Sequence, residues 1–370
     1  MKKILFLIHD LGVGGAEKVL VNLVNHMDHT RFDITVISLF GGGVNEQFLA
    51  PHIHYRAVWK KAVSGNSKLM KLLTPRQLHR ICVKEHYDVE IAYLEGPAAR
   101  VISGCQDAGT KLLCWIHCTL HTSKEASGAF RSYREAQNCY GQFCNIICVS
   151  EPLKAAFQSF FPKLKDRIVV RYNTNETDRI LSLKDEPIKD FSFPSDEIKL
   201  VAVGKICGNK GFDRLARIIK RLRNAGHFVH MYALGEGPDQ QAIEEWLKEN
   251  NLSDYYTFLG YQKNPYKYVS KCDLFVCASL SEGFSTAATE ALIVGTPVCT
   301  VEVSGMKEML GAHNEWGVVT DNDDEALYQG IRSLISDPAL LSYYREKAKE
   351  RGKSFSTENT VKAVEGLFEA

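Results

Sequence analysis

Long apolar runs are absent from this sequence of 370 residues. A membrane-spanning helix needs about 20 consecutive apolar residues, so we expect no such helix here. The apolar run at residues 4–8 (ILFLI) is too short for a signal peptide, and no small-residue cleavage site follows it. We interpret this run as the first strand of the fold.

The sequence also lacks a disulfide framework and a recognisable metal-binding pattern. Its eleven cysteines are odd in number and lie largely in apolar runs, which is typical of a reducing compartment such as the cytosol. Two cysteines and two histidines between residues 114 and 121 fit no common zinc spacing. Asp321 and Asp323 form a D-x-D pattern directly before a helical sequence, so we interpret them as an N-cap. We therefore expect no metal ion and no cofactor.

Acidic residues are missing from one long basic segment. Between Arg56 and Lys84 there are eight Lys and Arg, no Asp or Glu, and interleaved apolar residues such as Trp59. This composition predicts a segment, residues 56–84, that binds an anionic membrane surface, with a solvated basic loop as the alternative. The first 180 residues have 23 Lys and Arg against 16 Asp and Glu, whereas the remainder has 22 against 28. This asymmetry also suggests that one half meets an anionic surface.

Strands and helices alternate twice along the sequence. The first series begins at KILFLIH and ends near RIVVRYN, and the second begins at KLVAVG. Residues 178–197, between the two series, contain two prolines and mixed charge, and we interpret them as a linker. Such alternation predicts βαβ units and parallel sheets. The predicted fold is α/β with two domains, residues 1–178 and 198–355, and a C-terminal helix, residues 356–370, that packs back on the first domain.

The stretch 281–298, SEGFSTAATEALIVGTPV, combines a turn with a helix start. It follows an apolar strand sequence; Gly283 permits a turn, and the Ser-Thr pair after it can cap the next helix. A helix N-terminus reached through such a turn suits a phosphate group. Glu282 and Glu290 are eight positions apart, which is a rise of about 12 Å in a helix. We infer one carboxylate at each end of a nucleotide diphosphate sugar.

The pattern E-x7-E followed by G-x-P-V resembles the retaining family-4 glycosyltransferases of GT-B fold. Four further motifs resemble the same family in the same order: GVGGAE at residues 12–17, ICVSE at 147–151, VGKICGNKGFD at 203–213 and LGEGPD at 234–239. The resemblance implies two Rossmann-like domains that face a cleft. It also implies that the first domain binds the acceptor and that the second binds the nucleotide sugar.

The resemblance further implies which residues act at the strand ends. The catalytic residues would be Glu282, His117, Lys210 and Lys205. The donor-binding residues would be Gly14, Gly15, Gly204, Gly235, Gly237, Tyr261, Gly283, Phe284, Ser285, Thr286 and Glu290. The two lysines would neutralise the diphosphate leaving group, and Glu290 would bind the ribose hydroxyls. Glu282 would hold hydroxyls of the transferred sugar, with a covalent nucleophile as the alternative.

The implied function is retaining transfer of a sugar from a nucleotide diphosphate sugar, expected to be UDP-linked. The acceptor would be a hydroxyl of a glycan or lipid-linked glycan in cell-surface polysaccharide or glycolipid synthesis. We expect a cytoplasmic protein that is peripheral on the inner face of the membrane and has no nucleic-acid partner. The alternatives are a GT-B epimerase or phosphorylase, or a non-catalytic GT-B subunit that binds a partner transferase.

Overall fold

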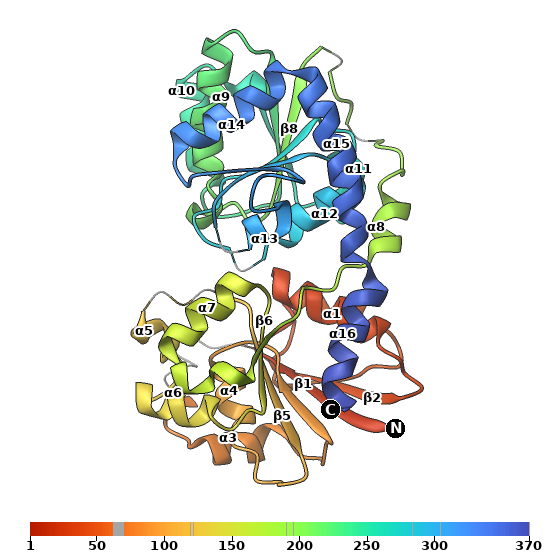
Figure 1. The fold of residues 1–370 in the computed structure, drawn as a ribbon, viewed down its shortest axis with the longest axis vertical. Helices are drawn as coiled ribbons and strands as arrows, with labels where there is room; N and C mark the ends of the chain where they lie inside the picture. Colours follow the sequence, from red (N-terminus) through yellow and green to blue (C-terminus); the bar gives the residue numbers. More distant parts are fainter. Residues whose placement is uncertain are drawn as a thin grey trace. The chain divides into compact units, whose positions relative to one another are not determined.

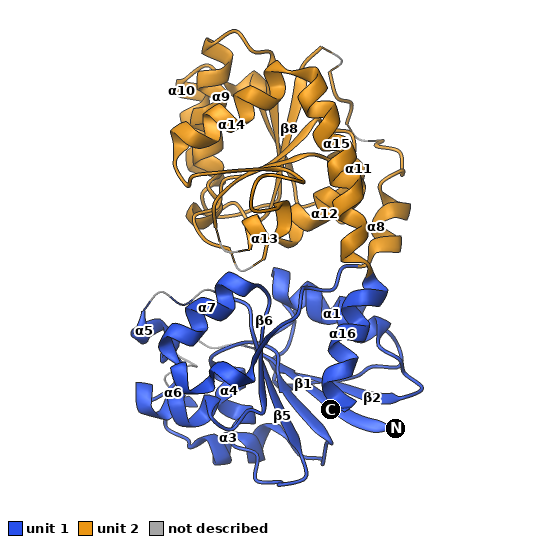
Figure 2. Cartoon of the chain, in the orientation of Figure 1, with its two compact units in different colours: residues 1–175, 357–370 blue, residues 176–356 orange. Residues whose placement is uncertain are grey.

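The computed structural model describes residues 1–61, 70–118, 120, 122–189, 191–194, 196–282, 284–303 and 305–369. The chain forms two compact units (Figure 2). Unit 1 contains Met1–Asn175 together with Thr357–Ala370, and unit 2 contains Glu176–Ser356.

Unit 1 is built on a parallel sheet that has seven strands in the described residues, in the order β3-β2-β1-β4-β5-β6-β7. The strands are β1 (Lys2–Ile8), β2 (Phe32–Phe40), β3 (His54–Trp59), β4 (Val89–Ala92), β5 (Lys111–Ile116), β6 (Asn145–Cys148) and β7 (Ile168–Val170). β1 and β4 are almost entirely buried, as expected for central strands covered by helices on both faces.

Helices cover both faces of this sheet. They are α1 (Gly15–His26), α3 (Pro75–Cys82), α4 (Pro97–Ile102), α5 (Ser123–Ala126), α6 (Tyr133–Tyr140), α7 (Glu151–Phe160) and α16 (Thr357–Glu369), with 3-10 turns η1 (Glu46–Phe48) and η2 (Pro162–Arg167). Figure 1 shows α1 and α16 on one side of the sheet and α3, α4 and α6 on the other. Capping residues determine where several of these helices begin. Thr74 and Gln77 form a capping box at α3, and Ser132 and Ser150 cap α6 and α7.

The C-terminal helix α16 belongs to unit 1, although it follows unit 2 in the sequence. The Phe368 ring lies edge-on to Phe32 and Phe6, with centroid distances of 5.7 and 6.3 Å. Glu365 accepts a hydrogen bond from the backbone N–H of Asp28 at 2.8 Å. The helix is therefore held on the amino-terminal strands by apolar packing and by a buried carboxylate.

Unit 2 is built on a second parallel sheet, with six strands in its described part, in the order β10-β9-β8-β11-β12-β13. The strands are β8 (Ile198–Val203), β9 (Val229–Leu234), β10 (Tyr256–Gly260), β11 (Leu274–Cys277), β12 (Val298–Val301) and β13 (Val318–Thr320). The helices are α8 (Thr177–Leu183), α9 (Phe212–Asn224), α10 (Gln240–Glu249), α11 (Tyr266–Val269), α12 (Thr286–Val294), α13 (Met306–Leu310), α14 (Asp324–Ser336) and α15 (Pro338–Gly352), with 3-10 turns η3 (Gly208–Lys210), η4 (Ser253–Tyr255) and η5 (Lys353–Phe355).

The stretch at residues 178–197 differs from the predicted linker, because it begins with helix α8 and lies within unit 2. Ile180 is buried, and Asn264 donates a hydrogen bond to the Leu183 carbonyl at 2.9 Å. A helix of seven residues with one buried apolar side chain has almost no hydrophobic periodicity. The sequence pattern therefore gave no sign of it.

The predicted α/β class and the two Rossmann-like sheets are confirmed. In parallel sheets of this kind, ligands bind beyond the carboxyl ends of the strands. The described residues contain no helix that is both long and apolar enough to cross a membrane.

Candidate functional site

The loops at the carboxyl ends of β8 and β11 bring Lys210 and Glu282 together. Lys210 Nζ lies 2.6 Å from Glu282 Oε1, and the Ser279 hydroxyl donates to the same oxygen at 2.7 Å. Burial lowers the pKa of Lys210, but the adjacent Glu282 carboxylate outweighs this effect and the pKa is raised. Lys210 therefore remains positively charged at neutral pH, at a point where a phosphate could share it with Glu282.

The two loops are tied together by backbone contacts. Leu280 N–H donates to the Asn209 carbonyl at 2.8 Å, and the Asn209 side chain donates to the Ser281 carbonyl at 3.0 Å. Gly211 has φ +67°, and a Cβ there would lie 2.3 Å from the Ala278 carbonyl oxygen. Only glycine allows this approach, so Gly211 fixes the position of Lys210 beside the end of β11.

Three predicted donor-binding glycines make another close approach at the ends of β8 and β9. A Cβ on Gly235 would lie 1.9 Å from the Gly204 carbonyl oxygen, and one on Gly237 would lie 2.0 Å from the Ile206 carbonyl oxygen. Gly204 N–H donates to the Leu234 carbonyl at 2.9 Å. The backbones of these loops therefore pack against each other without intervening side chains.

Helix α12 begins at Thr286, and the hydroxyl of Ser285 caps it by accepting from Ala288 N–H at 3.3 Å. Phe284 is buried and lies edge-on to Phe355 at 6.1 Å, so its side chain packs inside unit 2. Gly283, which we predicted as a donor-binding residue, lies outside the described residues. The N-terminus of α12 thus directly follows the loop that holds Glu282.

Glu290 is buried on α12, and the Tyr266 hydroxyl donates to its Oε1 at 3.1 Å. Tyr266 begins α11 and was not found by the sequence analysis, because one tyrosine in a short helix has no distinguishing pattern.

Lys205 is exposed in the loop after β8. Tyr261 is exposed, and its N–H donates to Glu236 Oε1 at 3.5 Å.

The glycine loop of unit 1 contains an acidic residue that the sequence analysis missed. Asp10 accepts from Gly12 N–H at 2.8 Å and lies 2.7 Å from His9 Nδ1. Gly14 is the N-cap of α1, and a Cβ there would lie 1.9 Å from Glu17 Oε2. Gly15 is the first residue of α1. The loop therefore presents the start of α1 next to two carboxylates, those of Asp10 and Glu17.

His117 follows β5 and is buried. Its backbone N–H donates to Glu95 Oε2 at 2.9 Å, and the centroid of its ring lies 5.0 Å from that of the Tyr93 ring. Burial lowers the pKa of His117 to about 3, so the ring is neutral at neutral pH. Within the described part of the chain, Nε2 of this ring has no hydrogen-bond partner. A buried ring nitrogen of this kind can bond a hydroxyl group of a ligand.

Glu95 is the acidic group beside His117, and the sequence analysis did not select it. Burial raises its pKa, although the backbone N–H of His117 acts in the opposite direction. Its position directly after the apolar sequence DVEIAYL was the available signal, because Glu282 also lies in the loop that follows a buried strand, β11.

Family models match both halves of the chain. A model described as "Glycosyltransferase Family 4" matches residues 13–179, and one described as "Glycosyl transferases group 1" matches residues 184–351. The chain is a glycosyltransferase of the family-4 type. The resemblance found in the sequence motifs is therefore confirmed at the level of the family.

Two curated relatives align with this glycosyltransferase over nearly its whole length. The N-acetylgalactosamine-N,N'-diacetylbacillosaminyl-diphospho-undecaprenol 4-alpha-N-acetylgalactosaminyltransferase of Campylobacter jejuni is 28% identical over 96% of each chain. The lipopolysaccharide core biosynthesis glycosyltransferase LpsD of Rhizobium meliloti is 24% identical over 98% of this chain and 95% of its own.

Solved structures support the fold. Anabaena Alr3699/HepE in complex with UDP has a TM-score of 0.78 at 19% identity, with 99% of each chain covered. A glycosyltransferase from Rickettsia africae has a TM-score of 0.80 at 16% identity, with 100% of this chain and 98% of the other covered.

We expect Gly235→Ala to destabilise unit 2, because its Cβ would collide with the Gly204 carbonyl and the residue has φ +134°. Strain of this kind costs roughly 1–3 kcal/mol. Urea unfolding should show a lower midpoint for this variant than for the wild type. Gly208→Ala is the matched control, since its Cβ would have Asp239 Oδ2 as nearest neighbour at 3.7 Å, an ordinary contact. Equal midpoints for the two variants would show that the close approach is not rigid.

Proposed function

We propose that this glycosyltransferase transfers a sugar from a UDP-linked donor, with retention of configuration, to a hydroxyl of a lipid-linked glycan or related glycan. The observation that carries the proposal is the Lys210–Glu282 pair in the loops that precede the α12 N-terminus. The names of the relatives support the proposed classes of donor and acceptor. The Campylobacter enzyme is named for a diphospho-undecaprenol acceptor, and the Anabaena structures contain UDP or UDP-glucose.

The diphosphate of the donor would bind at the start of α12. Free N–H groups and the positive end of the helix dipole favour an anion there, and Lys210 adds a full charge beside it. Lys205 is exposed in the same loop system and would add a second cation. Charge that develops on the leaving phosphate is thereby stabilised by fixed groups, with no metal ion required.

Glu282 and Glu290 would bind the two ends of the donor. Glu290 is buried and would accept hydrogen bonds from the ribose hydroxyls, with Tyr266 holding one of its oxygens. Glu282 would accept hydrogen bonds from hydroxyls of the transferred sugar. In this scheme the bond between the anomeric carbon and the phosphate oxygen breaks. The acceptor oxygen attacks from the same face, and its proton passes to the leaving phosphate.

His117 and the glycine loop of unit 1 would contribute neutral hydrogen bonds. The His117 ring is uncharged at neutral pH because of its depressed pKa, so it can bond a sugar hydroxyl without adding charge. The Gly14 N–H donates to the Gly12 carbonyl at 3.1 Å, so in this loop the N–H of Gly15, the first residue of helix α1, would bind an oxygen atom of a substrate.

The described part of the basic segment, residues 56–61 and 70–84, supports a membrane-facing role. Leu72 is 75% exposed and Ile81 is 39% exposed, so two large apolar side chains of this segment face solvent. Arg131 donates to the Leu72 carbonyl at 2.8 Å and so holds the backbone under this side chain. Arg56 instead donates to the Cys82 carbonyl at 2.6 Å and is engaged within the fold. We propose a protein that is peripheral on the cytoplasmic face of a membrane.

We expect Glu290→Gln and Lys210→Met each to weaken UDP binding at least tenfold. The loss of one charge-assisted hydrogen bond costs about 1.5–3 kcal/mol. Calorimetry on the full chain gives the affinities, and the exposed residues of α10 supply the controls Glu249→Gln and Lys248→Met. The site is misplaced if both test variants bind UDP as tightly as their controls.

Glu282→Gln should reduce turnover far more than UDP affinity, because we place Glu282 on the sugar side of the phosphates. Steady-state rates and calorimetry separate the two effects. The anomeric configuration of the product, read by NMR, should match that of the donor. An inverted product would rule out retention, whatever the effect of the substitution on rate.

Transfer should persist in the presence of a chelator, because lysines and a helix N-terminus supply the positive charge for the leaving group. The measurement is the initial rate directly after addition of EDTA, compared with the rate after excess Mg²⁺ or Mn²⁺ is restored. A rate that disappears with EDTA and returns with the metal would require a metal at the diphosphate.

Replacement of Lys60, Lys61, Lys68 and Lys71 by Gln should release the protein from anionic vesicles. Each basic residue near such a surface contributes about 1 kcal/mol, and the attraction fades with salt. Lys68 lies outside the described residues and is included because the proposal covers the whole basic segment. Co-sedimentation with anionic and with neutral vesicles measures the effect.

The matched control replaces four other lysines of unit 1, namely Lys124, Lys154, Lys163 and Lys165, by Gln. This control has the same net charge as the test variant and keeps the basic segment. If both variants are released equally from anionic vesicles, net charge alone explains the binding, and the basic segment has no special role. UDP binding should be unchanged in both.

A further inference from the structure

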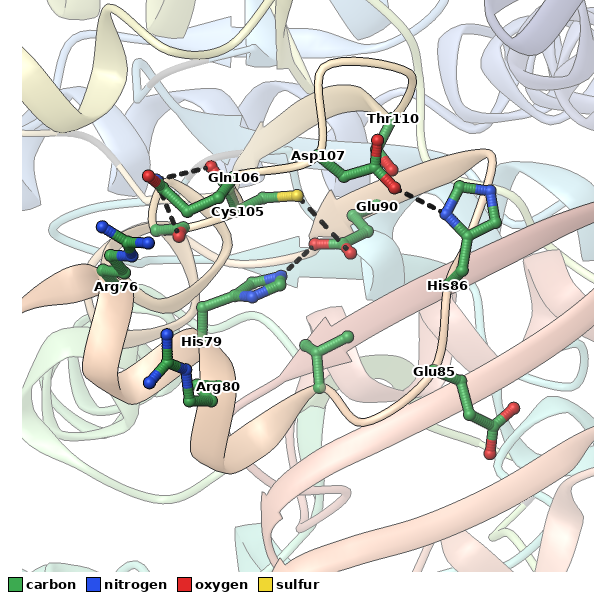
Figure 3. A pocket seen from close by; sticks show the side chains of 12 residues that line it. Arg76, His79, Arg80, Glu85, His86, Glu90, Cys105, Gln106, Asp107 and Thr110 are labelled. Atoms are coloured by element: carbon green, nitrogen blue, oxygen red, sulfur yellow. Dashed lines mark hydrogen bonds and ion pairs between the residues drawn. The ribbon is translucent and has the colours of Figure 1, made fainter.

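A pocket of about 270 Å³ lies in unit 1, away from the strand ends described above. Its walls come from α3, from β4 and from the segment 104–110 (Figure 3). Glu90 in β4 lines it, whereas Glu95, which contacts His117, follows the carboxyl end of the same strand. The pocket and the candidate substrate site are therefore separate features of one sheet.

Three side chains of different chemical types converge in this pocket. They are His79 from α3, Glu90 from β4 and Cys105 from the segment after α4, and their ligand atoms all lie within 4.8 Å of one another. His79 Nε2 lies 2.7 Å from Glu90 Oε2, and Cys105 Sγ lies 3.8 Å from Glu90 Oε1. Figure 3 shows the imidazole and the thiol both directed at the carboxylate.

The three donor types match those that zinc takes in proteins, namely histidine nitrogen, carboxylate oxygen and cysteine sulfur. A tetrahedral zinc ion keeps its ligands about 3.3–3.7 Å apart. The separation of 2.7 Å is shorter than this range, that of 3.8 Å is slightly longer, and no pair of ligand atoms is more than 4.8 Å apart. Side-chain adjustments of about 1 Å would therefore form the site. In the part of the chain that the structure describes, no other group of three such residues comes together in this way.

The surroundings of Glu90 favour a cation. Its side chain is 3% exposed, and a carboxylate that is removed from water needs a charged partner, which His79 at 2.7 Å can supply when no metal ion is bound. Arg76 and Arg80 also line the pocket, but in Figure 3 their guanidinium groups lie on the far side of the His79 ring from Glu90. The pocket gives an entry path and room for a water molecule as a fourth ligand.

We propose that His79, Glu90 and Cys105 bind a zinc ion, with the fourth coordination position open to the pocket. On binding, the Cys105 thiol loses its proton to solvent and His79 Nε2 becomes a neutral ligand. The ion would connect α3 to β4 and to the segment after α4. It takes no part in sugar transfer, so UDP affinity should be the same with and without zinc.

The test uses the purified full chain after removal of bound metal. Titration with Co²⁺ should produce a thiolate-to-metal absorption band, and one equivalent of Zn²⁺ should remove it. Cys105→Ser should abolish the band, and Cys105→Ser and His79→Gln should each weaken zinc binding at least tenfold. The matched controls are His86→Gln, which lies in the same pocket and pairs with Asp107 at 2.7 Å, and Cys144→Ser, an exposed cysteine elsewhere in unit 1.

A second measurement needs no variant and therefore does not depend on the variants being folded. Zinc should slow alkylation of Cys105 in the wild-type protein, followed by mass spectrometry, while the alkylation of Cys144 stays unchanged. Cobalt binding without a thiolate band, zinc affinity that is unchanged in Cys105→Ser, or the same alkylation rate of Cys105 with and without zinc would overturn the proposal.

Discussion

The candidate donor site of unit 2 depends on close backbone packing between neighbouring strand ends. A Cβ on Gly235 would collide with the Gly204 carbonyl oxygen, and a Cβ on Gly211 would collide with the Ala278 carbonyl oxygen. Parallel strands end at a common edge of a sheet, but side chains normally keep the following loops apart. Here glycine removes that spacing, so that the loops after β8, β9 and β11 form one continuous surface. The position of Lys210 next to Glu282 is a consequence of this packing.

The ion pair on that surface is only partly buried, and this decides how it can act. The Lys210 side chain is 30% exposed and that of Glu282 is 12% exposed. A fully buried pair would gain little net stability, because desolvation offsets the attraction between the charges. A partly exposed pair keeps the lysine charge reachable from solvent, while Ser279 holds the carboxylate of Glu282 by a hydrogen bond at 2.7 Å. In such a pair, Lys210 can exchange the Glu282 carboxylate for a phosphate with little change in free energy. This suits the proposed role, in which Lys210 binds a phosphate only when the donor is present.

The sequence predicted the parts of the structure that follow from periodicity and local chemistry. Alternating strands and helices gave both parallel sheets, and Ser285 gave the start of α12. Contacts between distant segments could not be predicted in the same way. Tyr266 pairs with Glu290 from a helix of four residues, and Glu95 reaches His117 from a different strand. The group His79, Glu90 and Cys105 has irregular spacing, because its members come from a helix, a strand and a loop. Such groups become visible only once the sheet order is known.

The polar groups that we singled out at the strand ends of the two units differ in charge, and in the proposed function this difference matches the chemistry of sugar transfer. Unit 2 keeps a charged lysine and carboxylate at its strand ends. Unit 1 keeps His117 neutral, and burial shifts the pKa of Glu95 upward, toward its uncharged form. When a sugar leaves a diphosphate, the large change in charge occurs on the phosphate, whereas sugar hydroxyls stay neutral. Fixed cations stabilise the first group, and neutral hydrogen-bonding groups suit the second without a charge that must be desolvated. In the proposed function, the charged Lys210 of unit 2 therefore suits the phosphate, and the neutral His117 ring of unit 1 suits a hydroxyl group.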